Sequence, residues 1–318
     1  MKILIRKKNN QTLSKKMNIA PILLFTYKRL DTLKTTVEAL AKNELAADSE
    51  LFIFSDAAKV EKDEVIVKQV RDFIKTITGF KAITVVEAEK NKGLAKSIID
   101  GVTSVFQKFD TVIVLEDDLS TTSNFLTFMN TCLEKYKSDP AAFSISGYAF
   151  NLGQSKDDHD DAYFLKRGWS WGWATWKDRW SDVDWAVKDY ALFKKDSRAQ
   201  REFAVGGSDL NKMLAEQMEG RLDSWAIRWF YHQFRKGGLT IYPVFSKVFN
   251  NGFDQFATHT NGSGRRYLPA LDTEERMSFS LPHKVQVNQF YQNKFILKMG
   301  LVSRIISKIE TIFQRVFK

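Results

Sequence analysis

The stretch Thr111-Val112-Ile113-Val114-Leu115-Glu116-Asp117-Asp118 joins an apolar run directly to three carboxylates. The apolar part has the length and residue types of a buried strand. Like charges at the end of such a strand repel one another and cost stability unless a cation or hydrogen-bond donors neutralise them. Hard divalent cations take oxygen ligands, and Mg²⁺ commonly uses one or two carboxylates together with substrate phosphates. The stretch therefore predicts a metal bound to a nucleotide diphosphate; the alternative is a solvated acidic turn.

Three similar units precede this stretch, each an apolar run followed by apolar residues at helical spacing. The expected strands and helices are 19–26, 51–54 and 83–86, and 30–40, 65–74 and 94–106. This alternation predicts an α/β fold with a mostly parallel sheet flanked by helices. In such sheets ligands bind beyond the carboxyl ends of the strands, where Thr26, Tyr27, Asp56 and the acidic triplet 116–118 fall. No G-x-G-x-x-G follows the first strand and no P-loop is present, so a classical dinucleotide or P-loop enzyme is excluded.

Composition supports a folded globular chain of 318 residues, with 44% hydrophobic and 27% charged residues. The single cysteine, Cys132, excludes an internal disulfide and a thiolate metal cluster. Lys and Arg number 48 against 38 Asp and Glu, a formal net charge of +10. Residues 1–20 contribute +6 and residues 294–318 contribute +5, which leaves −1 for the body. A nucleic-acid enzyme carries its basic stripe on the folded body, so no nucleic-acid partner is expected.

The charged ends favour an anionic membrane surface, with tails that merely aid solubility as the alternative. Near the C-terminus, apolar residues at three- and four-residue steps fall on one helical arc flanked by basic residues; they are Val302, Ile305, Ile309, Ile312 and Val316. Such a helix can lie in a lipid headgroup layer, or it can pack on the body. The prediction is a cytoplasmic protein, peripheral on the inner face of the cell membrane through a basic amphipathic helix at 286–318.

All eight tryptophans lie between Trp169 and Trp229, and four of them fall in the ten residues 167–176. Aromatic side chains dominate core burial, so half or more of the eight are expected in the core. Aromatic faces also suit the C–H faces of sugar rings. One or two of Trp169, Trp171 and Trp173 are therefore expected to contact an acceptor.

Several elements, taken in order, resemble the N-acetylglucosaminyltransferase I-like branch of the GT-A glycosyltransferases, together with bacterial family 2-like sugar transferases. They are Thr26-Tyr27-Lys28-Arg29, Ser55-Asp56, Leu115-Glu116-Asp117-Asp118-Leu119, Asp223-Ser224-Trp225, and the segment 243–259 with Gly252 and His259. The resemblance spans about residues 18–265. The Trp-rich run 167–176 is similar to that of bacterial members acting on surface polysaccharides. One departure is Ser224, which replaces the second acid of the family's pair.

The resemblance implies a GT-A fold and an inverting transfer of sugar from a nucleotide-diphosphate donor, a UDP-sugar first, to a glycan or lipid-linked saccharide. It implies that Asp118 coordinates Mn²⁺ or Mg²⁺. The residues it places around the donor are Thr26, Tyr27, Arg29, Asp56, Lys92, Glu116, Asp117 and His259. Departure of a nucleoside diphosphate leaves charge that a metal can stabilise, and a carboxylate can accept the acceptor's proton. Asp223 is the expected base, with Asp209, Glu216 and Glu219 as rivals and a helix N-cap as its structural alternative.

The expected organisation is a basic tail at 1–17, a nucleotide-sugar-binding half at 18–150, an acceptor-side half of the same domain at 151–285, and the C-terminal helix. A sugar nucleotidyltransferase is the first rival function. It would want a Gly-rich phosphate loop after the first strand, where Thr26-Tyr27-Lys28-Arg29 has no glycine. A non-catalytic carbohydrate-binding protein is the second. It would keep the aromatics but has no need of the acidic triplet.

Overall fold

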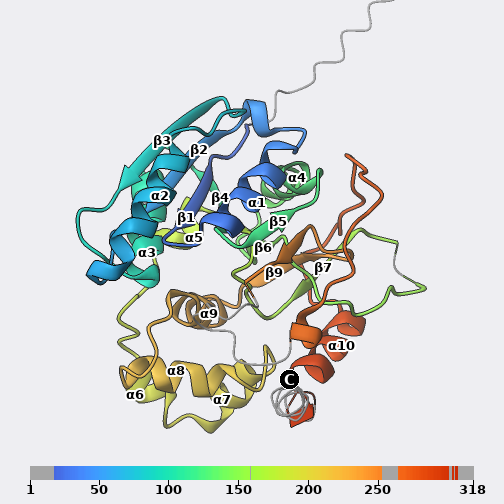
Figure 1. The fold of residues 1–318 in the computed structure, drawn as a ribbon. Coiled ribbons are helices and arrows are strands. Elements are labelled where there is room, and N and C mark those ends of the chain that lie inside the picture. Colours follow the sequence, from blue (N-terminus) through green and yellow to red (C-terminus); the bar gives the residue numbers. More distant parts are fainter. Residues whose placement is uncertain (1–17, 158, 253–263, 301–302, 304, 307–318) are drawn as a thin grey trace, which may run out of the picture.

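The computed structural model describes residues 18–157, 159–252, 264–300, 303 and 305–306. Their centre is an eight-stranded sheet with the order β3-β2-β1-β4-β8-β6-β9-β7. Figure 1 shows β3 at one end of the sheet and β7 near α10 at the other. The strands are β1 (Ile22–Thr26), β2 (Glu50–Ser55), β3 (Ala82–Glu87), β4 (Thr111–Glu116), β6 (Ala142–Ser146), β7 (Ala162–Leu165), β8 (Trp173–Trp176) and β9 (Leu239–Pro243).

The first four strands pair in parallel, as the alternating sequence pattern predicts. Every residue of β1 is buried, because helices cover both faces of this part of the sheet. The second half is mixed: β8 is antiparallel to β4 and to β6, β9 is parallel to β6, and β7 is antiparallel to β9. The α/β class is therefore confirmed, and the sheet runs unbroken through both halves of the chain.

Ten α-helices occur in the described part of the chain. They are α1 (Leu30–Ala41), α2 (Glu64–Ile74), α3 (Leu94–Val105), α4 (Phe125–Tyr136), α5 (Lys177–Ser181), α6 (Tyr190–Phe193), α7 (Ser197–Ala204), α8 (Leu210–Met218), α9 (Trp225–Arg235) and α10 (Gln289–Met299). Two apolar clusters form the core. One includes Leu33 of α1, Phe128 of α4 and Phe295 of α10, and the other includes Ile98 of α3 and Trp229 of α9. The predicted helices at 30–40, 65–74 and 94–106 are thus confirmed within a residue or two.

Most of the tryptophans belong to the core, as expected. Trp169, Trp173, Trp176, Trp180, Trp225 and Trp229 are at most 6% exposed, whereas Trp171 and Trp185 are partly exposed. Trp173 lies at the centre of one group, with ring centroids 4.5 Å from Trp229 and 5.0 Å from Trp225. The Trp-rich run therefore fastens β8 to α9.

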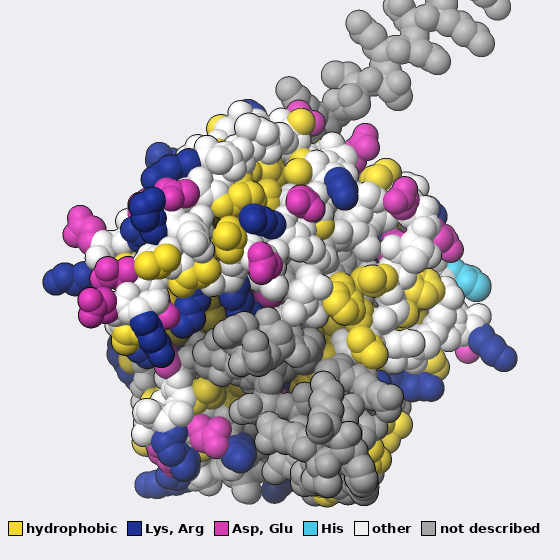
Figure 2. All heavy atoms as spheres, in the orientation of Figure 1, with side chains coloured by type: hydrophobic (Ala, Val, Ile, Leu, Met, Phe, Trp, Pro, Cys, Tyr) yellow, Lys and Arg dark blue, Asp and Glu magenta, His cyan; other side chains and the backbone are white. Residues whose placement is uncertain are grey.

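On the face shown in Figure 2, basic and acidic side chains are interspersed over the upper and left parts, and no continuous basic stripe crosses them. Among the described residues, no helix combines the length and the hydropathy needed to cross a bilayer. The arc predicted at 302–316 lies outside the described residues except for Ile305.

Candidate active site

The acidic triplet 116–118 lies at the carboxyl end of β4, beside β1. Glu116 is the last residue of β4 and pairs with Phe25. The chain then enters a second, two-stranded sheet, in which β5 (Leu119–Thr121) pairs antiparallel with β10 (Val248–Asn250). The residues after the triplet therefore form a strand rather than the cap of α4, whose N-cap is Asn124.

Residues at the carboxyl end of β1 and just after it hold two of the three carboxylates. Asp117 is buried and accepts hydrogen bonds from the Thr26 hydroxyl at 2.8 Å and from the Tyr27 backbone N–H at 3.1 Å. Asp118 accepts a hydrogen bond from Arg29 Nη1 at 2.7 Å, and the two side chains are about equally shielded, at 15% and 16% exposed. The carboxyl ends of β1 and β4 thus meet, as parallel pairing requires.

The triplet carries more negative charge than its surroundings neutralise. Burial, reinforced by Asp118 and Asp117, raises the pKa of Glu116 to about 8, and Arg29 only partly opposes this. Burial and Asp118 likewise raise the pKa of Asp117 to about 6. Crowded carboxylate oxygens that favour a compensating charge fit a hard divalent cation.

This charge predicts a pH-dependent stability. Both folded pKa values lie above the ordinary 4.5 and 3.8, so the folded protein holds protons that the unfolded chain releases. The stabilising contribution of these bound protons is fully present below the ordinary pKa values. It is lost as the pH rises through the folded pKa values of about 6 and 8. Without divalent metal, Tm is expected to fall from pH 5 to 9, and Glu116→Gln is expected to flatten the part above pH 7. Scanning fluorimetry measures both; identical slopes in the two proteins would contradict the assignment.

A segment distant in sequence closes against Asp118. The Asn251 N–H donates to the Asp118 carbonyl at 2.7 Å, and the Gly252 N–H donates to Asn250 Oδ1 at 2.6 Å. A Cβ added to Gly252 would overlap the Asp118 carboxylate. Any residue other than glycine at position 252 would displace this carboxylate. His259, the other residue predicted from the segment 243–259, lies outside the described residues.

Asp56 organises the turn that contains Lys92. Its carboxylate accepts backbone hydrogen bonds from Lys92 at 2.9 Å and from Gly93 at 3.0 Å, and a side-chain bond from Asn91 at 3.1 Å. Gly93 has φ +75°, which favours glycine, and it precedes α3. The ammonium of Lys92 pairs instead with Asp100 at 3.2 Å. Asp56 therefore shapes the edge of the site between β2 and α3.

Asp63 belongs to this region, although the sequence pattern does not single it out. Its carboxylate accepts a hydrogen bond from the Tyr27 hydroxyl at 2.8 Å and an ion pair from Lys28 at 3.0 Å. The Tyr27 hydroxyl also accepts the Lys59 N–H at 2.8 Å. These contacts fix the turn after β1. Asp63 was missed because it lies in a short polar stretch between elements, with no local motif.

Asp223 and Ser224 stand at the start of α9. Ser224 is the N-cap, with its side chain accepting the Ile227 N–H at 3.3 Å, so Asp223 does not have the structural role offered as its alternative. The Asp223 side chain is 71% exposed and 3.6 Å from Arg228. Trp225 stacks on Trp173, and Trp173 pairs with Val114 of β4. The packing therefore anchors this turn to the strand that bears the triplet.

The rival carboxylates have partners of their own. Asp209 forms a two-bond ion pair with Arg167, at 2.8 and 3.1 Å, and the Arg167 side chain is 5% exposed. This buried ion pair gives Arg167 a structural role and argues against Asp209 as the catalytic base. Glu216 pairs with Lys212 at 3.6 Å, and Glu219 pairs with the exposed Arg221.

The three predicted acceptor-side tryptophans differ in access. Trp173 is 1% exposed and is a packing residue, which argues against contact with an acceptor. Trp169 is 6% exposed and stacks on Tyr148 at 5.4 Å. Trp171 is partly exposed and meets Tyr148 edge-on at 4.7 Å. Of the three, Trp171 offers a surface.

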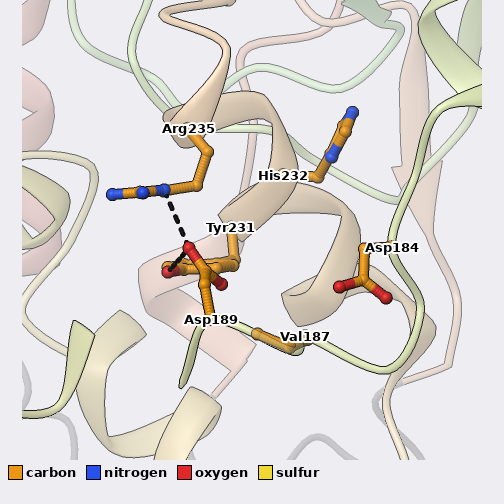
Figure 3. A pocket seen from close by; sticks show the side chains of 6 residues that line it. All are labelled: Asp184, Val187, Asp189, Tyr231, His232 and Arg235. Atoms are coloured by element: carbon orange, nitrogen blue, oxygen red, sulfur yellow. Dashed lines mark hydrogen bonds and ion pairs between the residues drawn. The ribbon is translucent and has the colours of Figure 1, made fainter. Parts of the chain in front are cut away.

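A small pocket lies elsewhere, between α9 and the segment that joins α5 to α6 (Figure 3). Its volume is about 130 Å³, and its lining residues are Asp184, Val187, Asp189, Tyr231, His232 and Arg235. Asp189 is already engaged by Tyr231 at 2.9 Å and Arg235 at 3.0 Å. Ligand pockets usually measure roughly 300–1,000 Å³, so this one is too small for a nucleotide sugar.

Among the residues that the structure describes, no group of three or more His, Cys, Asp or Glu side chains is arranged as metal ligands. A cation shared with a substrate diphosphate needs fewer protein ligands, often one or two carboxylates. The carboxylates at 116–118 have the oxygen ligands that such a shared cation needs.

Comparison with known proteins gives one family. A family model described as the GNT-I family matches residues 2–204. Matching solved structures include the mannosyltransferase PcManGT from Pyrobaculum calidifontis in complex with GDP-Man and Mn²⁺, at 13% identity and TM-score 0.29, covering 44% of this chain and 40% of that one. TarS from S. aureus matches at 13% identity and TM-score 0.35, covering 52% and 30%. The chain thus spans less than half of either structure. No curated protein matches.

Proposed function

This chain belongs to the GNT-I family, and on that premise we propose that it is a glycosyltransferase using a nucleotide-diphosphate sugar and a saccharide hydroxyl. The observation that carries the proposal is the meeting of Arg29, Asp118 and Gly252 at the carboxyl end of β4. A cation and a carboxylate stand together there, and a glycine keeps side-chain atoms away. Sheets of this class bind ligands at that edge.

Asp118 would hold Mn²⁺ or Mg²⁺, with Glu116 beside it. When bound, the metal supplies Lewis-acid stabilisation of the negative charge on the departing diphosphate. Arg29 is already placed against Asp118 and can pair with a phosphate oxygen as a charge-assisted donor. Asp56 and Lys92 border the nucleotide side, and Thr26 and Tyr27 hold Asp117 in place.

Asp223 is the proposed base. As the acceptor oxygen attacks the anomeric carbon, the bond from that carbon to the diphosphate oxygen breaks, and the hydroxyl proton passes to the Asp223 carboxylate. A single displacement inverts the anomeric centre and leaves no covalent enzyme intermediate. High exposure leaves the carboxylate accessible to an incoming saccharide.

Asp223→Asn is expected to lower kcat by roughly 10²–10⁴-fold, because the proton acceptor is lost. Tm and donor affinity should stay unchanged, since the side chain is exposed and its ion pair with Arg228 is long, at 3.6 Å. Glu219→Gln, a nearby exposed carboxylate paired with Arg221, is the matched control and should keep wild-type kcat. The reverse ranking of the two variants would move the base to Glu219.

The function is tested by incubating the protein with nucleotide sugars and Mn²⁺. We expect a UDP-sugar to raise Tm in a metal-dependent way and to release UDP slowly without an acceptor. Release of pyrophosphate would instead identify a sugar nucleotidyltransferase. Stabilisation by free saccharides without any nucleotide turnover would identify a carbohydrate-binding protein.

The basic tail and the C-terminal helix are proposed to hold the enzyme on an anionic membrane, where a lipid-linked acceptor in surface polysaccharide synthesis would be found. Phe295 and Met299 of α10 are buried, whereas Phe290 and Leu297 are 38% and 74% exposed. Truncation after Gly300 spares the buried face. It is expected to weaken sedimentation with phosphatidylserine vesicles, and unchanged sedimentation would refute the role of the tail.

A further inference from the structure

Arg266 holds two guanidinium donors that the described residues leave unsatisfied. It belongs to a single turn at Gly264–Tyr267, and its Nε and Nη1 are buried without a hydrogen-bond partner there. Its Nη2 donates to the Tyr267 hydroxyl, and its guanidinium carbon lies 4.6 Å from the Tyr267 ring centroid. A charged donor left unpaired is among the costliest buried groups, so a folded protein that keeps one has a use for it.

Aromatic rings surround this cation. Tyr267 lies 5.6 Å from Trp171, edge to face, and its carbonyl accepts a hydrogen bond from the Tyr148 hydroxyl at 2.8 Å. Tyr148 and Trp169 lie beneath and are buried, whereas Trp171, Tyr267 and Arg266 are partly exposed. We call these last three residues the aromatic shelf. Its firm base fixes both the rings and the cation.

The aromatic shelf packs against β10, the strand whose following residues, Asn251 and Gly252, contact Asp118. Gly172 follows Trp171 with φ +61°, and its carbonyl accepts the Gly147 N–H at 2.6 Å. A Cβ on Gly172 would lie 2.8 Å from Val248 Cγ2, so the shelf backbone rests against the first residue of β10. From Val248 to Gly252 is four residues, about 13 Å of extended chain at roughly 3.3 Å per residue. The shelf thus lies within a short saccharide's reach of the triplet.

We propose that the aromatic shelf binds a saccharide carrying an oxyanion, with a sugar ring against Trp171 and a carboxylate or phosphate on Arg266. The guanidinium is a charge-assisted donor for either group, and its Nε and Nη1 have no hydrogen-bond partner among the described residues. This inference rests on the proposed transferase function and adds the chemistry of the substrate. Two sources share that chemistry: an acidic acceptor saccharide, and the diphosphate of the donor.

Isothermal titration calorimetry on the full chain separates the sources. Glucuronic acid and glucose 6-phosphate are titrated against glucose in one arm, and UDP with Mn²⁺ in the other. The charged sugars should bind more tightly than glucose to the wild type, and Arg266→Gln should weaken them roughly 10- to 100-fold, as the loss of a charge-assisted pair predicts. Arg266→Lys should recover part of this. Unchanged UDP binding in Arg266→Gln assigns the oxyanion to the acceptor; weakened UDP with unchanged acid-sugar binding assigns it to the donor.

Arg198→Gln is the matched control, because Arg198 is 83% exposed on α7, and it should behave as wild type. The proposal is overturned if Arg266→Gln, folded by its Tm, binds every probe as the wild type does. It is equally overturned if glucose binds the wild type as tightly as its charged relatives do and Arg266→Gln leaves UDP binding unchanged. These binding readouts need no turnover, so a failure of the transferase assay and a failure of the shelf remain distinguishable.

Discussion

Asp118→Asn is expected to reduce sugar transfer by roughly 10³-fold, because it removes the charge that holds a cation opposite the leaving diphosphate. The amide has nearly the shape of the carboxylate and can still accept from Arg29, so the fold should survive. Asp118 is 15% exposed and paired with Arg29 at 2.7 Å. The measurement is nucleoside-diphosphate release from the donor that raises Tm, together with the metal-dependent part of that rise.

Asp110→Asn is the matched control. Asp110 lies just before the other end of β4 and is exposed, so the same change there should leave transfer and metal dependence intact. If Asp118→Asn keeps full metal-dependent stabilisation and turnover, Asp118 is not the metal ligand, and the proposed chemistry at the end of β4 is wrong.

Gly252→Ala is expected to cost roughly 10²-fold or more in transfer, an effect comparable with loss of one transition-state donor. Its Cβ would overlap the Asp118 carboxylate, which would have to turn away from Arg29 or push β10 off β5. Both movements displace the group that would hold the cation. The prediction is a loss of Mn²⁺-dependent stabilisation by UDP, with Tm in the absence of ligand falling by only a few degrees.

Gly220→Ala provides the comparison, because a Cβ there meets nothing within 4 Å, although φ is +71°. It should cost a little stability from backbone strain and leave turnover unchanged. Equal activity in Gly252→Ala and Gly220→Ala would show that Asp118 tolerates displacement, and the geometric argument for the site would fail.

The first half of the fold followed from local pattern. Strand 111–116 and the three strands before it are continuous apolar runs, and each helix between them repeats apolar residues at helical spacing. Each element can therefore be predicted from a short window of sequence. Parallel pairing then brings the ends of β1 and β4 together, which is why Arg29 and Asp118 could be expected at one place. The metal and nucleotide roles of these residues stay predictions.

Local sequence pattern did not predict the second half of the fold in the same way. No local pattern marks residues 119–121 as a strand, yet they form β5, because a partner strand 127 residues later, Val248–Asn250, supplies the hydrogen bonds. Trp171 and Trp173 are indistinguishable by composition, but one is partly exposed and the other is fully enclosed by Trp225 and Trp229. Asp209 was a candidate base until Arg167, 42 residues earlier, proved to be its partner.

What the amino-acid order determined alone is the α/β layer and the acidic end of its fourth strand, since strand and helix periodicity and the placing of charge after an apolar run are local properties. Only the tertiary structure decided that Gly252 seats the Asp118 carboxylate, that Trp173 is core, and that the Arg266 guanidinium lies among aromatic rings with two donors that no other described residue pairs. Contacts between distant segments depend on how layers pack and on which polar groups lose water together, and no short window of sequence contains that information.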